Sequence, residues 1–143
     1  MLQHRETRIL PYTADQLFNL VMDIRSYPDF LPWCRGVRIK EMAEDSITAD
    51  LVIGYKVYSE RFRSHVKFAR PTYINVDYLK GPLRNLQNEW HFKDLPDGYC
   101  EVKFFVEFSF KSKMLQSIAS QFFDIALKKM INAFEQEAKK RYG

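Results

Sequence analysis

The chain has 143 residues, 46% of them hydrophobic and 15% aromatic, and a formal net charge of +4 at pH 7. This composition excludes a disordered chain, and the length predicts one domain over residues 1–143 with a core of its own. No apolar run reaches the roughly 18 residues that span a membrane, no signal-peptide segment follows Met1, and Cys34 and Cys100 form neither a disulfide framework nor a metal-binding pattern. We therefore expect a soluble, cytoplasmic protein with reduced thiols.

The N-terminal residues predict a strand followed by a short helix. Residues 2–10 are assigned as a strand, and Thr13 with Gln16 has the spacing of a capping box at the start of a helix. The apolar face of this helix is expected at Leu17, Leu20, Val21 and Ile24.

An unusually apolar segment follows, with the sequence Tyr27-Pro28-Asp29-Phe30-Leu31-Pro32-Trp33-Cys34. Its two prolines argue against a regular helix or a central strand. Loops usually lie on the surface and are polar, whereas this segment offers four large apolar side chains to the residues beneath it. We therefore predict a loop that either seals the core or covers a cavity.

Alternation with a period of two predicts antiparallel strands through the middle of the chain. The inward-facing sets are Ile47, Ala49, Leu51, Ile53 and Tyr55; Phe62, Ser64, Val66 and Phe68; Ile74, Val76 and Tyr78; Leu86, Asn88, Trp90 and Phe92; and Cys100, Val102, Phe104, Val106, Phe108 and Phe110. In the last strand, Glu101, Lys103 and Glu107 are expected on the outer face. Pro96-Asp97-Gly98 predicts the turn before it.

Residues 113–141 predict one long helix that covers the sheet, because apolar residues recur at helical spacing without Gly or Pro. Its sheet-facing residues are expected to be Leu115, Ala119, Phe122, Phe123, Ala126, Met130 and Phe134. Residues 111–143 also contain seven basic and three acidic side chains, so the whole net charge of +4 lies there. This pattern is typical of a solvated helix end; the alternative is attraction to an anionic membrane surface or to RNA.

This order of elements resembles the helix-grip fold of START-like domains, an α+β fold in which a curved antiparallel sheet wraps around a long C-terminal helix. More narrowly, the sequence resembles the coenzyme Q-binding family. The shared motifs are Tyr27-Pro28-x-Phe30-Leu31-Pro32-Trp33-Cys34, Ala49-x-Leu51-x-Ile53-Gly54-Tyr55, Ser64-x-Val66, Gly81-Pro82-Leu83-Arg84-x-Leu86-x-Asn88-x-Trp90-x-Phe92, Phe122-Phe123 and Met130-x-x-Ala133-Phe134-Glu135. Mitochondrial members carry an N-terminal targeting extension, so a chain that begins at its first strand resembles a bacterial member.

The resemblance implies a non-enzymatic protein that holds a polyprenyl quinone such as ubiquinone between the sheet and the C-terminal helix, in support of respiratory electron transport. It also implies transient contact with the surface of the inner membrane. The same family contains ribosome association toxins, which bind the large ribosomal subunit and block subunit joining. The motifs do not separate these two functions. No covalent cofactor and no metal is expected.

A quinone site requires an apolar channel and a few polar groups for the carbonyl oxygens. The inward polar residues Tyr55, Ser64, Tyr78 and Asn88 are candidates for those contacts; the alternative is that Ser64 and Asn88 satisfy nearby backbone groups. Residues 30–33 are expected at the mouth. The complete set of candidate ligand-binding residues is Phe30, Leu31, Pro32, Trp33, Leu51, Ile53, Tyr55, Ser64, Tyr78, Asn88, Trp90, Phe104, Phe122, Phe123 and Met130.

Catalytic chemistry is poorly represented in the sequence. His65 and His91 have the outward parity of their strands, and Glu60 is the one inward carboxylate of note. No Ser–His–Asp arrangement, metal-ligand spacing or glycine-rich phosphate loop occurs. We therefore do not expect an enzyme.

Overall fold

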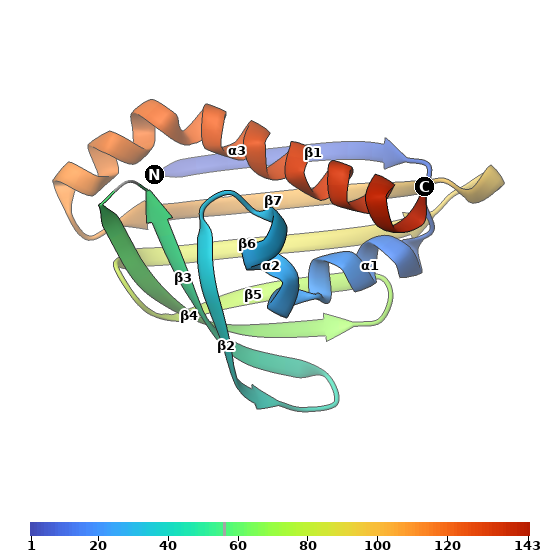
Figure 1. The fold of residues 1–143 in the computed structure, drawn as a ribbon, viewed down its shortest axis with the longest axis horizontal. Helices are drawn as coiled ribbons and strands as arrows, with labels where there is room; N and C mark the ends of the chain where they lie inside the picture. The colour runs from blue at the N-terminus through green and yellow to red at the C-terminus, as the bar shows by residue number, and fades with distance from the viewer. Residues whose placement is uncertain (56) are drawn as a thin grey trace.

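One antiparallel sheet of seven strands curves around a long helix (Figure 1). The computed structural model describes residues 1–55 and 57–143. The strands are β1 (Leu2–Leu10), β2 (Cys34–Met42), β3 (Ser46–Tyr55), β4 (Tyr58–Ala69), β5 (Tyr73–Lys80), β6 (Leu83–Asp94) and β7 (Cys100–Phe110). Their order is β1-β7-β6-β5-β4-β3-β2, so the first two strands of the chain form opposite edges of the sheet. This confirms the α+β fold class and the antiparallel meander.

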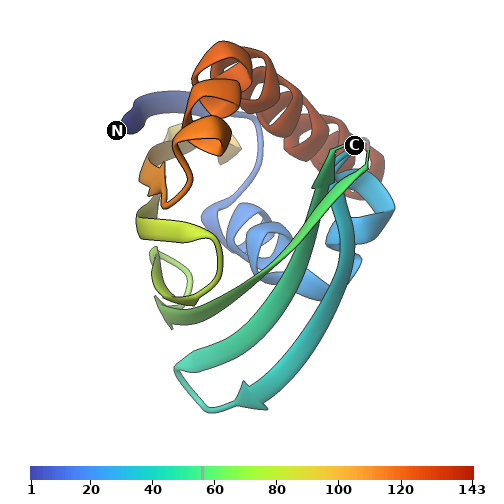
Figure 2. The same ribbon diagram turned by 90° about the vertical axis from the view of Figure 1, so that its left-hand side faces the viewer.

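The helices cover the concave side of the sheet (Figure 2). They are α1 (Ala14–Met22), the 3-10 turn η1 (Ile24–Ser26), α2 (Tyr27–Phe30) and α3 (Lys113–Tyr142), whereas the 3-10 turn η2 (Pro96–Gly98) lies in the connection between β6 and β7. The prediction of one uninterrupted C-terminal helix is confirmed, and the helix extends one residue beyond the predicted end. The C-terminal half of α3 lies beside α1, while its N-terminal half follows the β1 side of the sheet (Figure 1).

The predicted capping box begins α1. The Gln16 backbone N–H donates to the Thr13 hydroxyl over 3.1 Å, and the Thr13 backbone N–H donates to the Gln16 side chain over 3.0 Å. A cap of this kind stabilises a helix by about 1 kcal/mol. The Ala14 N–H also donates to the Asp94 carboxylate over 2.8 Å, which ties the start of α1 to the end of β6.

The apolar Pro-containing segment is partly helical, which corrects the prediction of a loop. Tyr27–Phe30 forms a single α-helical turn with Pro28 at its beginning. Proline is tolerated there because the N–H groups of the first turn have no partner within the helix. Only residues 31–33 connect irregularly to β2.

A strand that the sequence pattern did not predict forms over Cys34–Met42. Two register irregularities against β3, at Cys34/Gly36 and at Ile39/Glu41, interrupt its pairing. A bulge inserts a residue and shifts the alternation of faces. The period-two signal of β2 is therefore short and easily overlooked.

Inward parity on β7 is confirmed, but burial decreases along the strand. The buried inward residues are Cys100, Val102 and Phe104. Val106 and Phe108 are half-buried, which corrects the expectation that both are fully buried. Phe108 nevertheless faces α3, since its ring lies 5.6 Å from that of Phe123.

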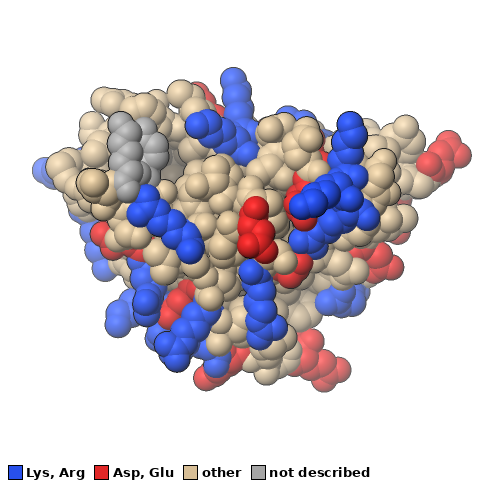
Figure 3. Space-filling model, viewed as in Figure 1, with Lys and Arg blue, Asp and Glu red and all other residues tan. Residues whose placement is uncertain are grey.

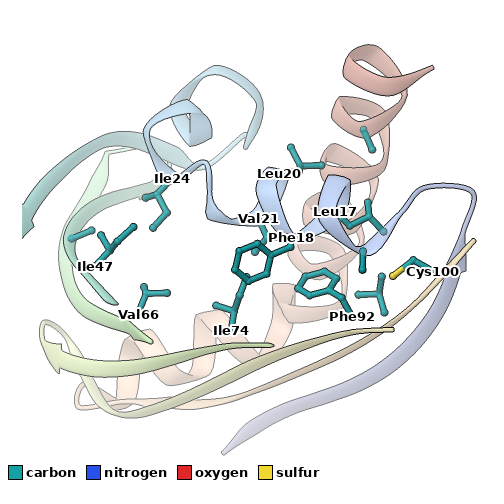
Figure 4. Close-up of a cluster of buried hydrophobic side chains, with 14 residues drawn as sticks. Leu17, Phe18, Leu20, Val21, Ile24, Ile47, Val66, Ile74, Phe92 and Cys100 are labelled. Carbon is teal, nitrogen blue, oxygen red and sulfur yellow. The ribbon is translucent and has the colours of Figure 1, made fainter. Parts of the chain in front are cut away.

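The densest part of the core lies between α1 and the sheet (Figure 4). Phe18 of α1 is fully buried and packs edge-on against Phe68 and Phe92, at 6.0 Å between ring centroids in each case. Ile74 of β5 is buried beneath it. This cluster fills the α1 end of the concave face.

Candidate functional site

A small apolar pocket lies between the second half of α3 and strands β1, β6 and β7. Its volume is about 60 Å³, and a second pocket of about 40 Å³ continues it toward α1. The first pocket is lined by Glu6, Arg8, Leu10, Trp90, Val102, Phe104, Met130, Ile131, Phe134 and Glu135. The second shares several of these residues and adds Leu17, Leu20, Val21, Phe92 and Ala138.

Trp90 of β6 forms the centre of the pocket wall. Its ring packs edge-on against Phe104 of β7 at 4.7 Å and against Phe134 of α3 at 5.5 Å. The indole N–H donates to Asn88 Oδ1 over 3.2 Å, and Asn88 Nδ2 donates to the Phe105 carbonyl over 2.9 Å. These contacts hold the indole in one orientation.

A row of charged side chains follows β1 along the same face of the sheet. His4, Glu6 and Arg8 pair with the inward residues of β7, so all three lie on the concave side. His4 Nε2 lies 2.8 Å from Glu6 Oε1, and the Arg8 guanidinium bonds to Glu6. Arg8 Nη1 also donates to Glu135 Oε1 of α3 over 2.8 Å. The apolar pocket therefore has one charged edge.

The contacts of this row keep Glu6 and Arg8 charged. Burial alone raises the pKa of Glu6, but the hydrogen bonds from Arg8 and His4 outweigh burial and hold that pKa below its usual value. The hydrogen bond to Glu6 in turn raises the pKa of Arg8. At neutral pH the pocket edge therefore contains a carboxylate and a guanidinium that neutralise each other.

The sequence interpretation overlooked these β1 residues. It assigned no parity to His4, because residues 3–8 are polar at every position and their pattern does not distinguish the two faces of the strand. Only the pairing with β7 shows that this set, and not its neighbours, faces α3.

Two of the four polar residues proposed for quinone contacts, Tyr78 and Asn88, have partners within the fold. The Asn88 amide bonds to Trp90 and to the backbone of β7, as the alternative reading expected. The Tyr78 hydroxyl accepts the Leu83 N–H over 2.9 Å. Ser64 is buried, 7% exposed. The side chain of Tyr55 lies outside the described residues.

The segment expected at the mouth packs beside the pocket and does not line it. Phe30 lies edge-on to Phe134 at 5.4 Å, and Leu31 is buried. Pro32 is exposed and Trp33 is half-buried. The Trp33 indole N–H is buried without a hydrogen-bond partner. This segment closes the gap between β2 and α3.

The remaining candidate residues divide between the pocket and its surroundings. Trp90, Phe104 and Met130 line the first pocket. Leu51 and Ile53 are half-buried on β3, and Phe123 packs on Phe108. Phe122 is 43% exposed, which corrects the expectation that it faces the sheet; Leu127 is buried instead.

The pocket is far smaller than a drug-sized ligand site. Pockets that enclose such ligands measure roughly 300–1,000 Å³, whereas this one measures about 60 Å³. In this measure of volume a single water needs roughly 10–15 Å³, so the pocket has room for only a few waters. A quinone therefore requires the space between α3 and the sheet to widen.

Catalytic and metal-binding groups do not converge on the pocket. Glu60 is exposed, and His65 and His91 lie on the outer face of the sheet, as predicted. Within residues 1–55 and 57–143, no three His, Cys, Asp or Glu side chains group as metal ligands. No helix in the described part of the chain is long and apolar enough to cross a membrane.

Comparison with known proteins defines the class of protein. Residues 10–135 match the family described as polyketide cyclase / dehydrase and lipid transport, to which the chain belongs. Within this class, its sequence is 39% identical over 97% of both chains to the ribosome association toxin RatA of Rickettsia prowazekii. It is also 30% identical to the mitochondrial coenzyme Q-binding protein COQ10 of Drosophila melanogaster, over 98% of this chain and 60% of that protein.

Solved structures confirm the START-like fold. An 18 kDa protein from Caulobacter crescentus is 36% identical and superposes with a TM-score of 0.80, over 100% of this chain and 99% of the other. The Zhui aromatase/cyclase from Streptomyces superposes with a TM-score of 0.86 over 99% and 96% of the chains at 15% identity. At that identity the likeness concerns the fold and not the activity.

Proposed function

We propose that this protein is a non-enzymatic binding protein that associates with the large ribosomal subunit and thereby blocks subunit joining. The observation that carries the proposal is the 39% identity to a ribosome association toxin over 97% of both chains. A similarity of this extent includes surface residues as well as the core. We also propose that the protein acts in the cytoplasm, where ribosomal subunits are found.

The closed pocket supports a function exerted through the surface. The space beneath α3 is about 60 Å³, and the inward polar groups Asn88 and Tyr78 already bond within the fold. A protein with such an interior keeps its shape without a bound lipid. Its surface is then the part available for recognition.

Sedimentation tests this function directly. Purified protein is mixed with separated small and large subunits, and Mg²⁺ is raised until the subunits join. We expect the protein to sediment with the large subunit, and the fraction of joined ribosomes to fall as protein is added. Sedimentation with neither subunit, or with the small subunit only, would contradict the proposal.

Quinone binding is the second candidate function, and the apolar pocket with its charged edge favours it. Apolar walls from Trp90, Phe104 and Phe134 suit a polyprenyl tail, and the Arg8 guanidinium can donate to a quinone carbonyl. Contact with the inner membrane would accompany loading of the quinone.

Mass spectrometry of organic extracts tests this second function, with the protein purified from its native host. A stoichiometric quinone in the extract supports quinone binding, and lipid-free protein contradicts it.

The similarity to aromatase/cyclases does not favour catalysis. A general acid or base works best with a pKa near the operating pH. The contacts of the pocket edge act in the opposite direction, because they hold the pKa of Glu6 below its usual value and raise that of Arg8. Binding without turnover is therefore part of the proposal.

A further inference from the structure

Four cations surround one buried carboxylate on the convex side of the sheet. Asp50 of β3 is 2% exposed and has Arg38 of β2 and Arg63 of β4 as its cross-strand neighbours. Arg61 Nη1 lies 4.0 Å from Asp50 Oδ2, and Lys40 acts electrostatically on the same carboxylate. We define Arg38, Lys40, Asp50, Arg61 and Arg63 as the outer basic face.

Asp50 organises this face and contributes no exposed negative charge. Arg63 donates to both of its oxygens, from Nε over 2.8 Å and from Nη2 over 3.1 Å. The Asp50 side chain is 3% exposed, whereas that of Arg61 is 65% exposed. Solvent therefore meets guanidinium and ammonium groups held above a hidden carboxylate.

The borders of the face are polar, neutralised or, at Glu41 of β2 opposite Thr48, acidic. Next to Asp50 along β3, Thr48 bonds to His65 of β4 over 2.9 Å. Farther along β4, Lys67 pairs with Asp77 over 3.0 Å, so the unneutralised positive charge ends there. Figure 3 shows the corresponding side of the molecule, where Lys and Arg side chains gather at the lower left, over β2, β3 and β4.

We propose that the outer basic face binds the phosphate backbone of ribosomal RNA. This inference rests on the proposed ribosome association and names the surface that performs it. Guanidinium groups bind phosphate oxygens with two parallel hydrogen bonds, and a fixed carboxylate partner such as Asp50 orients Arg63 in advance. Phosphate contacts of this kind supply most of the sequence-independent affinity for nucleic acid.

An anionic membrane fits this face less well. Peripheral membrane binding combines cations with apolar side chains that enter the lipid. Around Asp50 the outward positions are Thr48, its cross-strand partner Glu41 and cations, and the apolar Val52 is half-buried. On the neighbouring strand β5, Leu79 is a single exposed apolar side chain, and the exposed apolar residues of α3, Met114, Ile118 and Ile125, lie on a different element. RNA is therefore the partner that the chemistry of this face favours.

The basic end of α3 provides a matched control. Lys139 and Lys140 are exposed at the C-terminus of the helix, far along the chain from β2–β4. Arg38→Gln/Arg61→Gln and Lys139→Gln/Lys140→Gln each remove two positive charges. The two double variants therefore have equal net charge and differ only in where the charge is lost.

The probes are purified large subunits, deproteinised large-subunit RNA and phosphatidylglycerol vesicles, with binding to each measured between roughly 50 and 200 mM salt. At about 150 mM salt we expect Arg38→Gln/Arg61→Gln to bind both probes at least ~10-fold more weakly than wild type. The slope of log affinity against log salt should fall by about 0.7–0.9 for each lost phosphate contact. Lys139→Gln/Lys140→Gln should retain wild-type affinity and slope.

The outcomes separate this inference from the proposed function. If the wild type sediments with the large subunit and Arg38→Gln/Arg61→Gln binds as well as the wild type, the outer basic face is not the binding surface. The proposed ribosome association is then unaffected. If the protein binds RNA through this face in a salt-dependent way but does not sediment with the large subunit, the proposed function is wrong and the inference about the face is retained. If the double variant loses binding only to phosphatidylglycerol vesicles, the face is a membrane surface and the inference is wrong. If the double variant does not fold, the single variant Arg61→Gln replaces it in the same measurements.

Discussion

Arg8 of β1 and Glu135 of α3 are 127 residues apart in the sequence and form an ion pair of 2.8 Å at the edge of the pocket. This ion pair joins the first strand to the last helix, where the pocket would have to open for a ligand. Both side chains are partly exposed, 46% for Arg8 and 31% for Glu135. The pair therefore adds little stability but can restrict the movement of α3.

We expect Glu135→Gln to lower the free energy of unfolding by less than about 1 kcal/mol and to strengthen binding of a short-tailed quinone. Loss of the ion pair increases the population of molecules with α3 displaced, and apparent affinity rises with that population. Quenching of tryptophan fluorescence measures the binding. Lys67→Gln, which breaks an exposed ion pair on the convex side, is the control. Equal quinone affinity in all three proteins would show that this ion pair does not restrict entry.

The two tryptophans should respond oppositely to replacement by phenylalanine. The Trp33 N–H is buried without a partner, so Trp33→Phe removes an unsatisfied donor. The Trp90 N–H bonds to Asn88, so Trp90→Phe removes the partner of a partly buried acceptor, at a cost of about 0.5–1.5 kcal/mol. Urea unfolding should show Trp33→Phe clearly more stable than Trp90→Phe. Similar losses in the two variants would contradict this account.

The ion pair between Asp50 and Arg63 should make stability depend on pH in the acidic range. The hydrogen bond from Arg63 holds the pKa of Asp50 below its usual value of about 3.9. A lowered carboxyl pKa stabilises the folded state at pH values above the usual range, and this contribution is lost as pH falls through the folded-state pKa. Asp50→Asn should therefore be less stable than wild type at pH 7.

The difference between Asp50→Asn and wild type should shrink steadily below about pH 4. Thermal unfolding at a series of pH values measures it. Adding Arg63→Gln completes a double-mutant cycle, in which the coupling energy between the two residues should follow the same pH dependence. A constant difference from pH 7 to pH 2 would mean that Asp50 acts through packing and not through its charge.

Truncation of Phe18 should be far more costly than truncation of Phe122. Phe18 is fully buried between Phe68 and Phe92, and loss of a buried aromatic ring costs about 3–5 kcal/mol. Phe122 is 43% exposed, so Phe122→Ala removes less contact and less buried surface. Denaturant unfolding of the two alanine variants compares them. Comparable destabilisation would place Phe122 in the core, as the sequence pattern first predicted.

Local sequence signals predicted most of the elements correctly. The capping box of Thr13 and Gln16, the alternation on β7 and the helical spacing of α3 each depend on residues a few positions apart. The predictions that failed involve irregular backbone. Pro28 begins the helical turn α2, and two bulges obscure the alternation of β2.

The site was less predictable than the fold. Trp90, Phe104 and Met130 were correctly placed among the inward residues and line the pocket, but no pattern in the sequence gave the parity of β1 or showed that Glu6 and Arg8 form the pocket edge. The pocket volume depends on how closely α3 packs on the sheet, which is a property of many side chains together.

The charge distribution shows most clearly what the sequence can predict and what it cannot. By sequence, residues 1–110 are neutral and the net charge of +4 belongs to the C-terminal segment, but that sum conceals the grouping of Arg38, Arg61 and Arg63 around Asp50. At the C-terminus, Arg141 is instead paired with Glu137 over 2.8 Å and with Asp23 over 2.9 Å. The sequence by itself determined the elements, because helix and strand periodicity are short-range properties. Only the tertiary structure decided which charges neutralise one another, because strand register and helix docking bring together residues that are far apart in the chain.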